Sequence, residues 1–246
     1  MELKQLIKKN PWWKDKSSIE EDMHVKKFNQ AKFKRDYDPI GSFDEGIYSI
    51  RGARQIGKTT WIKLKIRELL KKVKPEQIFF YSLDLIKKNK ELAEIIETYL
   101  DYTDSDQRKY IFLDEVPNVN DWQLAIKDLY DSGRLTNCSV VLTGSHSLDL
   151  SRNIEKLPGR TGKGKRHFIF FPMNFFEYFN LRTDVDLGKG FKKDIFNLEK
   201  NQKQVQDLFL EYIKTGGFPK VLNEYIKNNN IDIYTFETYI KWIIGD

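Results

Sequence analysis

The residues best suited to chemistry form one short run, GARQIGKT, from Gly52 to Thr59. The glycines let the backbone turn so tightly that consecutive N–H groups point into one concavity, which suits an anion. A helix that begins near Lys58 adds the positive end of its dipole, and the Lys58 ammonium adds a mobile cation for the β- and γ-phosphates of a nucleotide. The Thr59 hydroxyl suits a Mg²⁺ ion. The run therefore predicts a phosphate-binding loop.

We expect the whole loop and the residue after it to contact the nucleotide, namely Gly52, Ala53, Arg54, Gln55, Ile56, Gly57, Lys58, Thr59 and Thr60. Arg54 has two interpretations, because a variable position in such a loop either touches phosphate or faces solvent. A strand-like segment leads into the loop and an amphipathic segment leads out of it, which is the strand–loop–helix order that the motif requires.

Two adjacent acids, Asp114 and Glu115, follow the apolar run YIFL. An apolar strand that ends in an acid places this acid at the carboxyl edge of a parallel sheet, where open α/β sheets bind ligands. We expect Asp114 to hold Mg²⁺, directly or through its water, and Glu115 to orient and deprotonate an attacking water. The alternative for Glu115 is an exposed acid at a strand end. The pair favours hydrolysis over simple docking of phosphate.

Three further residues are candidates for the catalytic site. Thr143 and Ser145 lie at the end of another apolar segment, and either hydroxyl could sense the γ-phosphate if this strand inserts between the first and third strands. Arg160 carries a fork of N–H donors that suits phosphate oxygens, so it could act as an arginine finger, within the chain or toward a neighbouring copy in a homo-oligomer. His146 is interpreted as a solvent-facing or capping residue, and the three histidines show no metal-ligand spacing.

The elements that must position these residues alternate between strands and helices. This alternation predicts an α/β fold with a parallel sheet flanked by helices. The expected strands are 47–51, 78–82, 110–113, 139–143 and 167–171, and the expected helices are 59–74, 90–100, 121–132, 173–181, 205–214 and 233–244. We expect Asp121 to cap the third of these helices. We expect an arm over residues 1–40, a core over 41–171 and a helical region over 172–246, and the last apolar segment indicates either a chain cut short or a helix whose partner lies elsewhere.

The arm over residues 1–40 has three interpretations. Trp12 and Trp13 stand among lysines, so the arm either packs on the core through its tryptophans or contacts nucleic acid through interleaved basic and aromatic residues. A third interpretation is a contact with the nucleotide base near Asp38–Ile40. The basic cluster Lys163, Lys165 and Arg166 is interpreted as a solvated loop rather than a DNA contact.

Composition excludes several classes of protein. The chain has 246 residues, 40% of them hydrophobic and 32% charged, which is typical of a globular protein rather than a disordered one. No apolar run is long enough to span a bilayer, and the single Cys138 excludes an intrachain disulfide framework, so a cytoplasmic protein is expected. The net charge of +6 suits a polyanionic ligand without requiring one.

These motifs together resemble the prokaryotic, archaeal-type P-loop ATPases of the AAA+ superfamily, close to the STAND group. The resemblance rests on RGARQIGKTT, YIFLDEVPNVNDW, LYDSGRL, VVLTGSHSLDLS, LPGR and FFPMNFFEYF, and it covers residues 40–220. It implies an additional-strand P-loop sheet in the order 5-1-4-3-2, the Walker A and Walker B motifs, ATP or ADP with Mg²⁺, and a helical lid. Pro219, in GGFP, is then a lid residue near the adenine. Its alternative is an ordinary stop after a helix.

The further C-terminal domain of such proteins is not expected in this sequence, so no DNA-directed role of that domain carries over. Three functions remain open. The first is an ATPase that acts as a motor or switch, the second is a slow nucleotide-gated module that binds a protein partner, and the third is a DNA-dependent ATPase.

Overall fold

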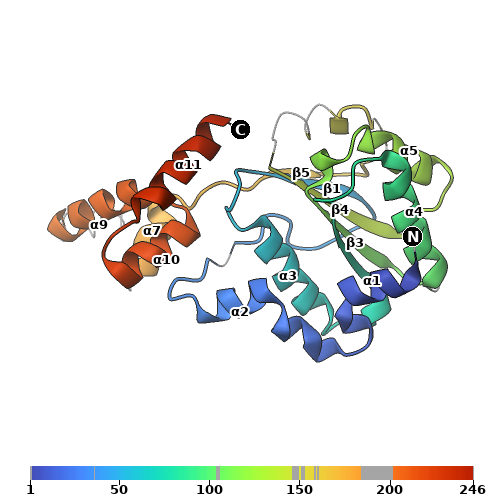
Figure 1. Cartoon of the computed structure of the whole chain (residues 1–246), viewed down its shortest axis with the longest axis horizontal. Helices are drawn as coiled ribbons and strands as arrows, with labels where there is room; N and C mark the ends of the chain where they lie inside the picture. The colour runs from blue at the N-terminus through green and yellow to red at the C-terminus, as the bar shows by residue number, and fades with distance from the viewer. Residues whose placement is uncertain are drawn as a thin grey trace.

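A five-stranded parallel sheet forms the centre of the computed structural model, which describes residues 2–245 except 36, 104–105, 146–149, 151–152, 158, 160 and 184–201. The strand order is β2-β3-β4-β1-β5 (Figure 1). This is the predicted order 5-1-4-3-2 counted from the other edge, so the predicted fold class is confirmed. The strands are β1 (Gly46–Arg51), β2 (Ile78–Ser82), β3 (Lys109–Asp114), β4 (Cys138–Gly144) and β5 (His167–Ile169).

Helices cover both faces of this sheet. They are α3 (Lys58–Leu69), α4 (Asn89–Tyr102) and α5 (Trp122–Asp131). The helices α4 and α5 lie together on one face, and α3 lies on the other (Figure 1). Every residue of β4 is buried, because this strand has a neighbour on each side and helices above and below. Its unbroken apolar run is what a strand buried on both faces requires.

Several features differ from those predicted. The helix α3 ends at Leu69 instead of Lys74, and Pro75 begins a short 3-10 helix six residues later. The strand β5 ends at Ile169, shortly before Pro172, which has no N–H to donate to a ladder. Asp121 does precede α5, but its backbone is left-handed, with φ at 51°, and its side chain makes no capping hydrogen bond.

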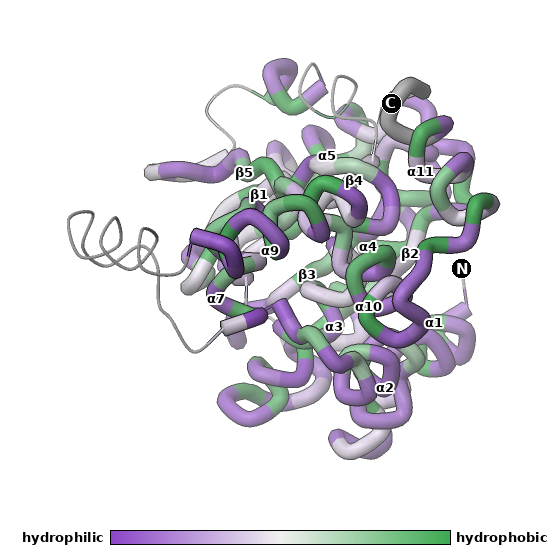
Figure 2. Tube along the Cα trace, turned by 90° about the vertical axis from the view of Figure 1, so that its left-hand side faces the viewer, coloured by the Kyte–Doolittle hydropathy of each residue, from purple (hydrophilic) through white to green (hydrophobic). Residues whose placement is uncertain are grey.

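The N-terminal arm packs on the core through its tryptophans, as the first of its three interpretations predicts. The indole N–H groups of Trp12 and Trp13 both donate to the carbonyl oxygen of Ile78, at 3.1 and 2.8 Å. Trp13 also stacks on Phe79 and Tyr99. The arm contains α1 (Leu3–Lys9) and a helix that was not predicted, α2 (Met23–Gln30). The trace of α2 is mostly hydrophilic (Figure 2).

In the described part of the chain, four helices follow the sheet and gather beside it at the left of Figure 1. They are α7 (Phe175–Arg182), α9 (Gln202–Thr215), α10 (Pro219–Asn228) and α11 (Ile233–Gly245). We call them the helical group. Met173, Tyr178, Phe179, Leu208 and Leu222 form a small apolar core within it. None of the helices in the described part of the chain is long and apolar enough to cross a membrane.

The helix α10 was not predicted from the sequence, where Gly216 to Pro219 was either a lid motif or a stop after a helix. The two glycines do end α9, with left-handed φ angles of 59° and 71°. A side chain at Gly217 would collide with the carbonyl oxygen of Met173, 2.1 Å from an ideal Cβ. Pro219 then begins α10, because its fixed φ suits the first turn of a helix.

We predict that Trp13→Ala lowers the free energy of unfolding by about 3–5 kcal/mol, because the substitution removes a large buried ring from an aromatic stack. Urea denaturation followed by circular dichroism measures this change. Lys14→Ala, at the exposed neighbouring position, is the matched control and should leave the midpoint within experimental error. Equal midpoints for the two variants would contradict the packed arm.

Candidate functional site

The loop between β1 and α3 has the backbone of an anion cradle. Gly57 precedes α3 with a left-handed φ of 108°, and no side chain caps this end of the helix. The first backbone hydrogen bond of α3 runs from Trp61 N–H to the Gly57 carbonyl at 2.9 Å, so the preceding N–H groups are directed toward the loop. At Gly52 an ideal Cβ would lie 2.4 Å from the carbonyl oxygen of Phe170, so only glycine fits there.

The Lys58 side chain lies across this loop. Its Nζ donates to the carbonyl oxygens of Gly52 and Ala53, at 2.8 and 3.1 Å, and lies 3.8 Å from a carboxylate oxygen of Glu115. The Lys58 side chain is 4% exposed, and that of Glu115 is 24% exposed. The ammonium is therefore held between the loop and the end of β3, within reach of both.

Asp114 connects the loop to the sheet. One carboxylate oxygen accepts a hydrogen bond from the Thr59 hydroxyl at 2.7 Å, and the other accepts one from the buried Thr143 hydroxyl. The Thr59 hydroxyl and the Asp114 carboxylate thus face one another at the sheet edge. Hydroxyl and carboxylate oxygens are the ligands that Mg²⁺ prefers, so this pair fits a magnesium ion.

Glu115 is positioned by the end of β4. Its backbone is left-handed, with φ at 55°, and its N–H donates to the Thr143 hydroxyl oxygen at 3.3 Å. One of its carboxylate oxygens accepts from Ser145, from the backbone N–H at 3.1 Å and from the hydroxyl at 3.0 Å. Thr143 and Ser145, the two candidates for a γ-phosphate sensor, therefore each hold one of the two acids.

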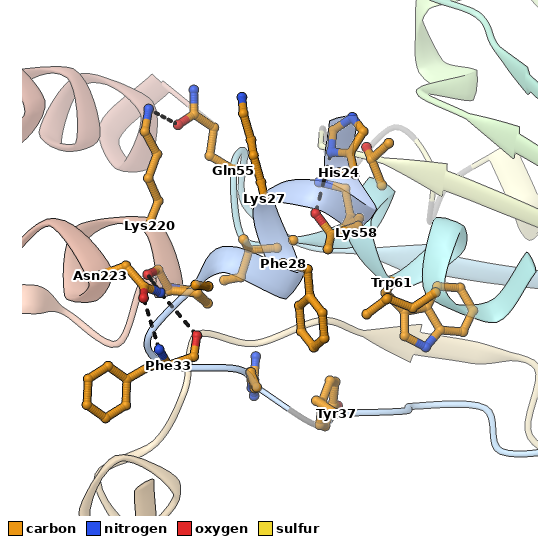
Figure 3. A pocket seen from close by; sticks show the side chains of 18 of the residues that line it. His24, Lys27, Phe28, Phe33, Tyr37, Gln55, Lys58, Trp61, Lys220 and Asn223 are labelled. Carbon is orange, nitrogen blue, oxygen red and sulfur yellow. Dashed lines mark hydrogen bonds between the residues drawn. The ribbon is translucent and has the colours of Figure 1, made fainter. Parts of the chain in front are cut away.

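A cavity of about 1110 Å³ opens beside the loop, and three parts of the chain form its walls (Figure 3). The first wall is the loop and the start of α3, from Gln55 to Trp61. The second is the arm, from His24 to Asp38, and the third is α10, with Pro219, Lys220 and Asn223. Pro219, the predicted lid residue, thus lines the same cavity as Lys58 and Thr59.

The tip of the loop contacts the helical group. The side-chain oxygen of Gln55 accepts hydrogen bonds from Lys220 of α10 at 3.0 Å and from the Tyr239 hydroxyl of α11 at 3.3 Å. Of the other loop residues, Ile56 is buried in the core and Arg54 is exposed. The loop is therefore hydrogen-bonded to the sheet through Thr59 and to the helical group through Gln55 at its tip.

Arg160 and His146 lie outside the described residues. In the basic cluster, Arg166 is buried, with its guanidinium 4.4 Å from the Tyr48 ring centre and a hydrogen bond to the Glu45 carbonyl at 3.2 Å. Arg166 therefore has an internal structural role, whereas Lys163 is exposed.

Comparison with known proteins identifies the family. A family model described as a AAA domain matches residues 44–179, which is more than half of the chain. The chain belongs to the AAA domain family. The predicted resemblance to archaeal-type P-loop ATPases of the AAA+ superfamily is thereby confirmed, and nucleotide binding is implied by the family. A closer relation to the STAND group stays a prediction.

The curated relatives are longer than this AAA protein. Two uncharacterized proteins of Methanocaldococcus jannaschii are 24% identical over 222 residues and 27% identical over 209 residues. These matches cover 81% and 80% of this chain but only 45% and 40% of the relatives. An uncharacterized protein of Haemophilus influenzae is 25% identical over 184 residues, which cover 72% of this chain and 40% of the relative.

Two solved structures are similar at a lower level. Cdc6p from Pyrobaculum aerophilum matches with a TM-score of 0.42 and 13% identity, over 72% of this chain and 48% of that protein. The ORC1 protein of Aeropyrum pernix, solved in complex with DNA, matches with a TM-score of 0.38 and 18% identity, over 55% of this chain and 42% of that protein.

Apart from Pro219 and Asp38, the residues that the arm and α10 bring to the cavity were not predicted from the sequence. His24 of α2 lines the cavity, with its Nδ1 3.5 Å from the Thr60 hydroxyl, and burial lowers its pKa. No spacing marks His24 as a site residue. For α10 a signal did exist, because Val221, Leu222, Tyr225 and Ile226 recur with helical spacing. Neither interpretation of Pro219, a lid residue or a stop, placed it at the start of a helix.

We predict that Thr143→Val destabilises the protein by about 1.5–3 kcal/mol, because it removes a hydroxyl that donates to the buried Asp114 carboxylate. Guanidinium denaturation measures the change. Thr143→Ser is the matched control, since it keeps the hydroxyl at the same place and should retain most of the stability. If the valine variant were as stable as the serine variant, the hydrogen bond to Asp114 would contribute nothing to the free energy of unfolding.

Proposed function

We propose that this protein binds ATP with Mg²⁺ and hydrolyses it to ADP, and that it acts as a nucleotide-driven switch or motor. One observation carries the proposal. The two acids at the end of β3 lie opposite the lysine and threonine of the phosphate-binding loop, so that Asp114 contacts Thr59 and Glu115 lies 3.8 Å from Lys58. This arrangement joins an anion cradle, a pair of oxygen ligands for a cation and a carboxylate base in one place.

The loop binds and orients the triphosphate. The N–H groups at the start of α3 donate to phosphate oxygens, and the Lys58 ammonium, now on the Gly52 and Ala53 carbonyls, turns to the β- and γ-phosphates. Thr59 and Asp114 would hold the magnesium ion, which neutralises charge on the phosphates when bound. Phosphoryl transfer needs little beyond such positioning and charge neutralisation.

Glu115 is the proposed general base. It is partly exposed, and Ser145 fixes one of its oxygens while the other faces Lys58. Once Lys58 moves to the phosphates, this second oxygen is left to accept a hydrogen bond from the attacking water and then its proton. The Thr143 hydroxyl donates to the Asp114 carboxylate and accepts from the Glu115 N–H, so it fixes the positions of the two acids relative to each other. Arg160 stays a proposed arginine finger, in its own chain or in a homo-oligomer.

The adenine base of the nucleotide would lie in the part of the cavity between the arm and α10. Apolar side chains of Phe28, Tyr37 and Pro219 line this part and could pack on a purine ring. We accordingly propose the division into an arm (1–40), a core (41–171) and a lid region (172–246), with the lid reaching the nucleotide through α10.

We predict that Glu115→Gln lowers the turnover number for ATP by about 10²–10³-fold, because the amide cannot take a proton from water. The dissociation constant for Mg-ATP should change by less than about threefold, since glutamine keeps the size of the side chain. Phosphate release measures the first quantity, and titration with a fluorescent nucleotide measures the second.

Glu97→Gln is the matched control, because Glu97 is an exposed acid on α4. Parent-like turnover in Glu115→Gln would remove Glu115 from the proposed role. A parent protein that never binds Mg-nucleotide would end the proposed function, and tight binding without turnover would favour the slow nucleotide-gated module.

A further inference from the structure

One segment of the arm joins the core to the helical group through hydrogen bonds. Residues 31–35, which follow α2, pass along the cavity and face α10 (Figure 3). We call this segment the strap. Upstream, the arm is fixed to the core by Trp12 and Trp13 and by an ion pair of 3.2 Å between Asp22 and Lys63 of α3. Downstream, the strap is fixed to the helical group.

Asn223 of α10 is the first attachment. Its side-chain oxygen accepts from the backbone N–H of Phe33 at 3.0 Å, and its side-chain nitrogen donates to the Phe33 carbonyl at 3.1 Å. The same nitrogen donates to the Pro219 carbonyl at 2.8 Å. One amide thus pairs with both backbone groups of one strap residue and also with the first turn of its own helix (Figure 3). This geometry fixes α10 in place beside the strap.

Arg35 is the second attachment. Its guanidinium donates to the Phe171 carbonyl at 2.6 Å and to the Glu177 carboxylate of α7 at 2.9 Å. The Arg35 side chain is 9% exposed, and its guanidinium lies 4.3 Å from the Tyr37 ring centre. A mostly buried arginine that makes charge-assisted hydrogen bonds to two acceptors is a stronger anchor than a surface ion pair.

The strap is one of the attachments that position the residues of α10. Pro219 and Lys220 line the cavity, and Asn223 lies on the same helix one turn further on. The helical group also contacts the core through Gln55, which accepts from Lys220 and Tyr239, and through Phe218, Val221 and Tyr239, which pack into the main hydrophobic core. Without the Asn223 attachment, α10 would keep this packing but lose its two hydrogen bonds to the strap.

We propose that Asn223 is a positioning residue that clamps α10 to the strap and thereby slows the release of bound nucleotide. The inference rests on the proposed function and deepens it, since it assigns the lifetime of the complex to an attachment outside the phosphate-binding loop. Preorganised contacts raise affinity because less order must be gained on binding, and such differences appear mainly in the dissociation rate.

The test is stopped-flow release of a fluorescent ADP analogue from the full chain. Asn223→Ala should raise the dissociation rate constant about tenfold, with the association rate constant changed by less than about threefold. Asn228→Ala is the matched control, because it removes an exposed asparagine near the end of the same helix and should release ADP at the parent rate. A merely structural loss would reduce the amplitude of binding and leave the release rate of the folded fraction unchanged.

Two more variants keep the test decisive if Asn223→Ala folds poorly. Asn223→Asp keeps the acceptor for the Phe33 N–H and loses the donor, so it should give an intermediate release rate. Arg35→Gln loosens the second attachment and should also speed release. Parent-like release from all folded variants would overturn the role of the strap alone. A parent that binds no ADP analogue would overturn the proposed function, and this inference with it.

Discussion

The hydrogen bonds that converge on Asp114 are the constraint on which the site depends. Its two carboxylate oxygens accept from Thr59 of the loop and from Thr143 of β4, so side chains from three neighbouring parts of the fold meet on one buried acid. A buried carboxylate is costly unless its oxygens are satisfied, and here both have donors. The position of the loop relative to the acids follows from this arrangement.

The register of the parallel sheet brings Thr59, Thr143 and Asp114 close enough to form these hydrogen bonds. The strand β4 lies between β1 and β3, and it pairs Thr143 with Ile50 on one side and Leu142 with Leu113 on the other. Parallel strands bring their carboxyl ends to one edge, so the loop after β1, the acids after β3 and Ser145 after β4 all arrive there. Glu115 then needs its left-handed backbone to turn its side chain toward Ser145 and Lys58.

The arm supplies a second layer of organisation. Lys63 of α3 is buried beside Asp22, with its ammonium 3.5 Å from the Phe80 ring centre, and burial lowers its pKa while Asp22 partly offsets this. Separating this pair would leave the buried ammonium without its partner, so the pair favours the observed position of the arm on α3. Because the strap continues from this fixed arm to α10, the cavity has walls from segments that are distant in the sequence. Pairing between such segments leaves no periodic pattern in either of them.

The sequence by itself determined the loop from Gly52 to Thr59, the acids at 114–115 and the strands that carry them, because backbone turns, buried strands and phosphate chemistry each need particular residues at short range. Only the tertiary structure decided that α2 and α10 border the cavity, that Thr143 and Ser145 each hold an acid, and that Asn223 pairs with Phe33. These contacts join groups that lie far apart in the chain, and neither residue type nor spacing shows which distant side chains and backbone groups will meet.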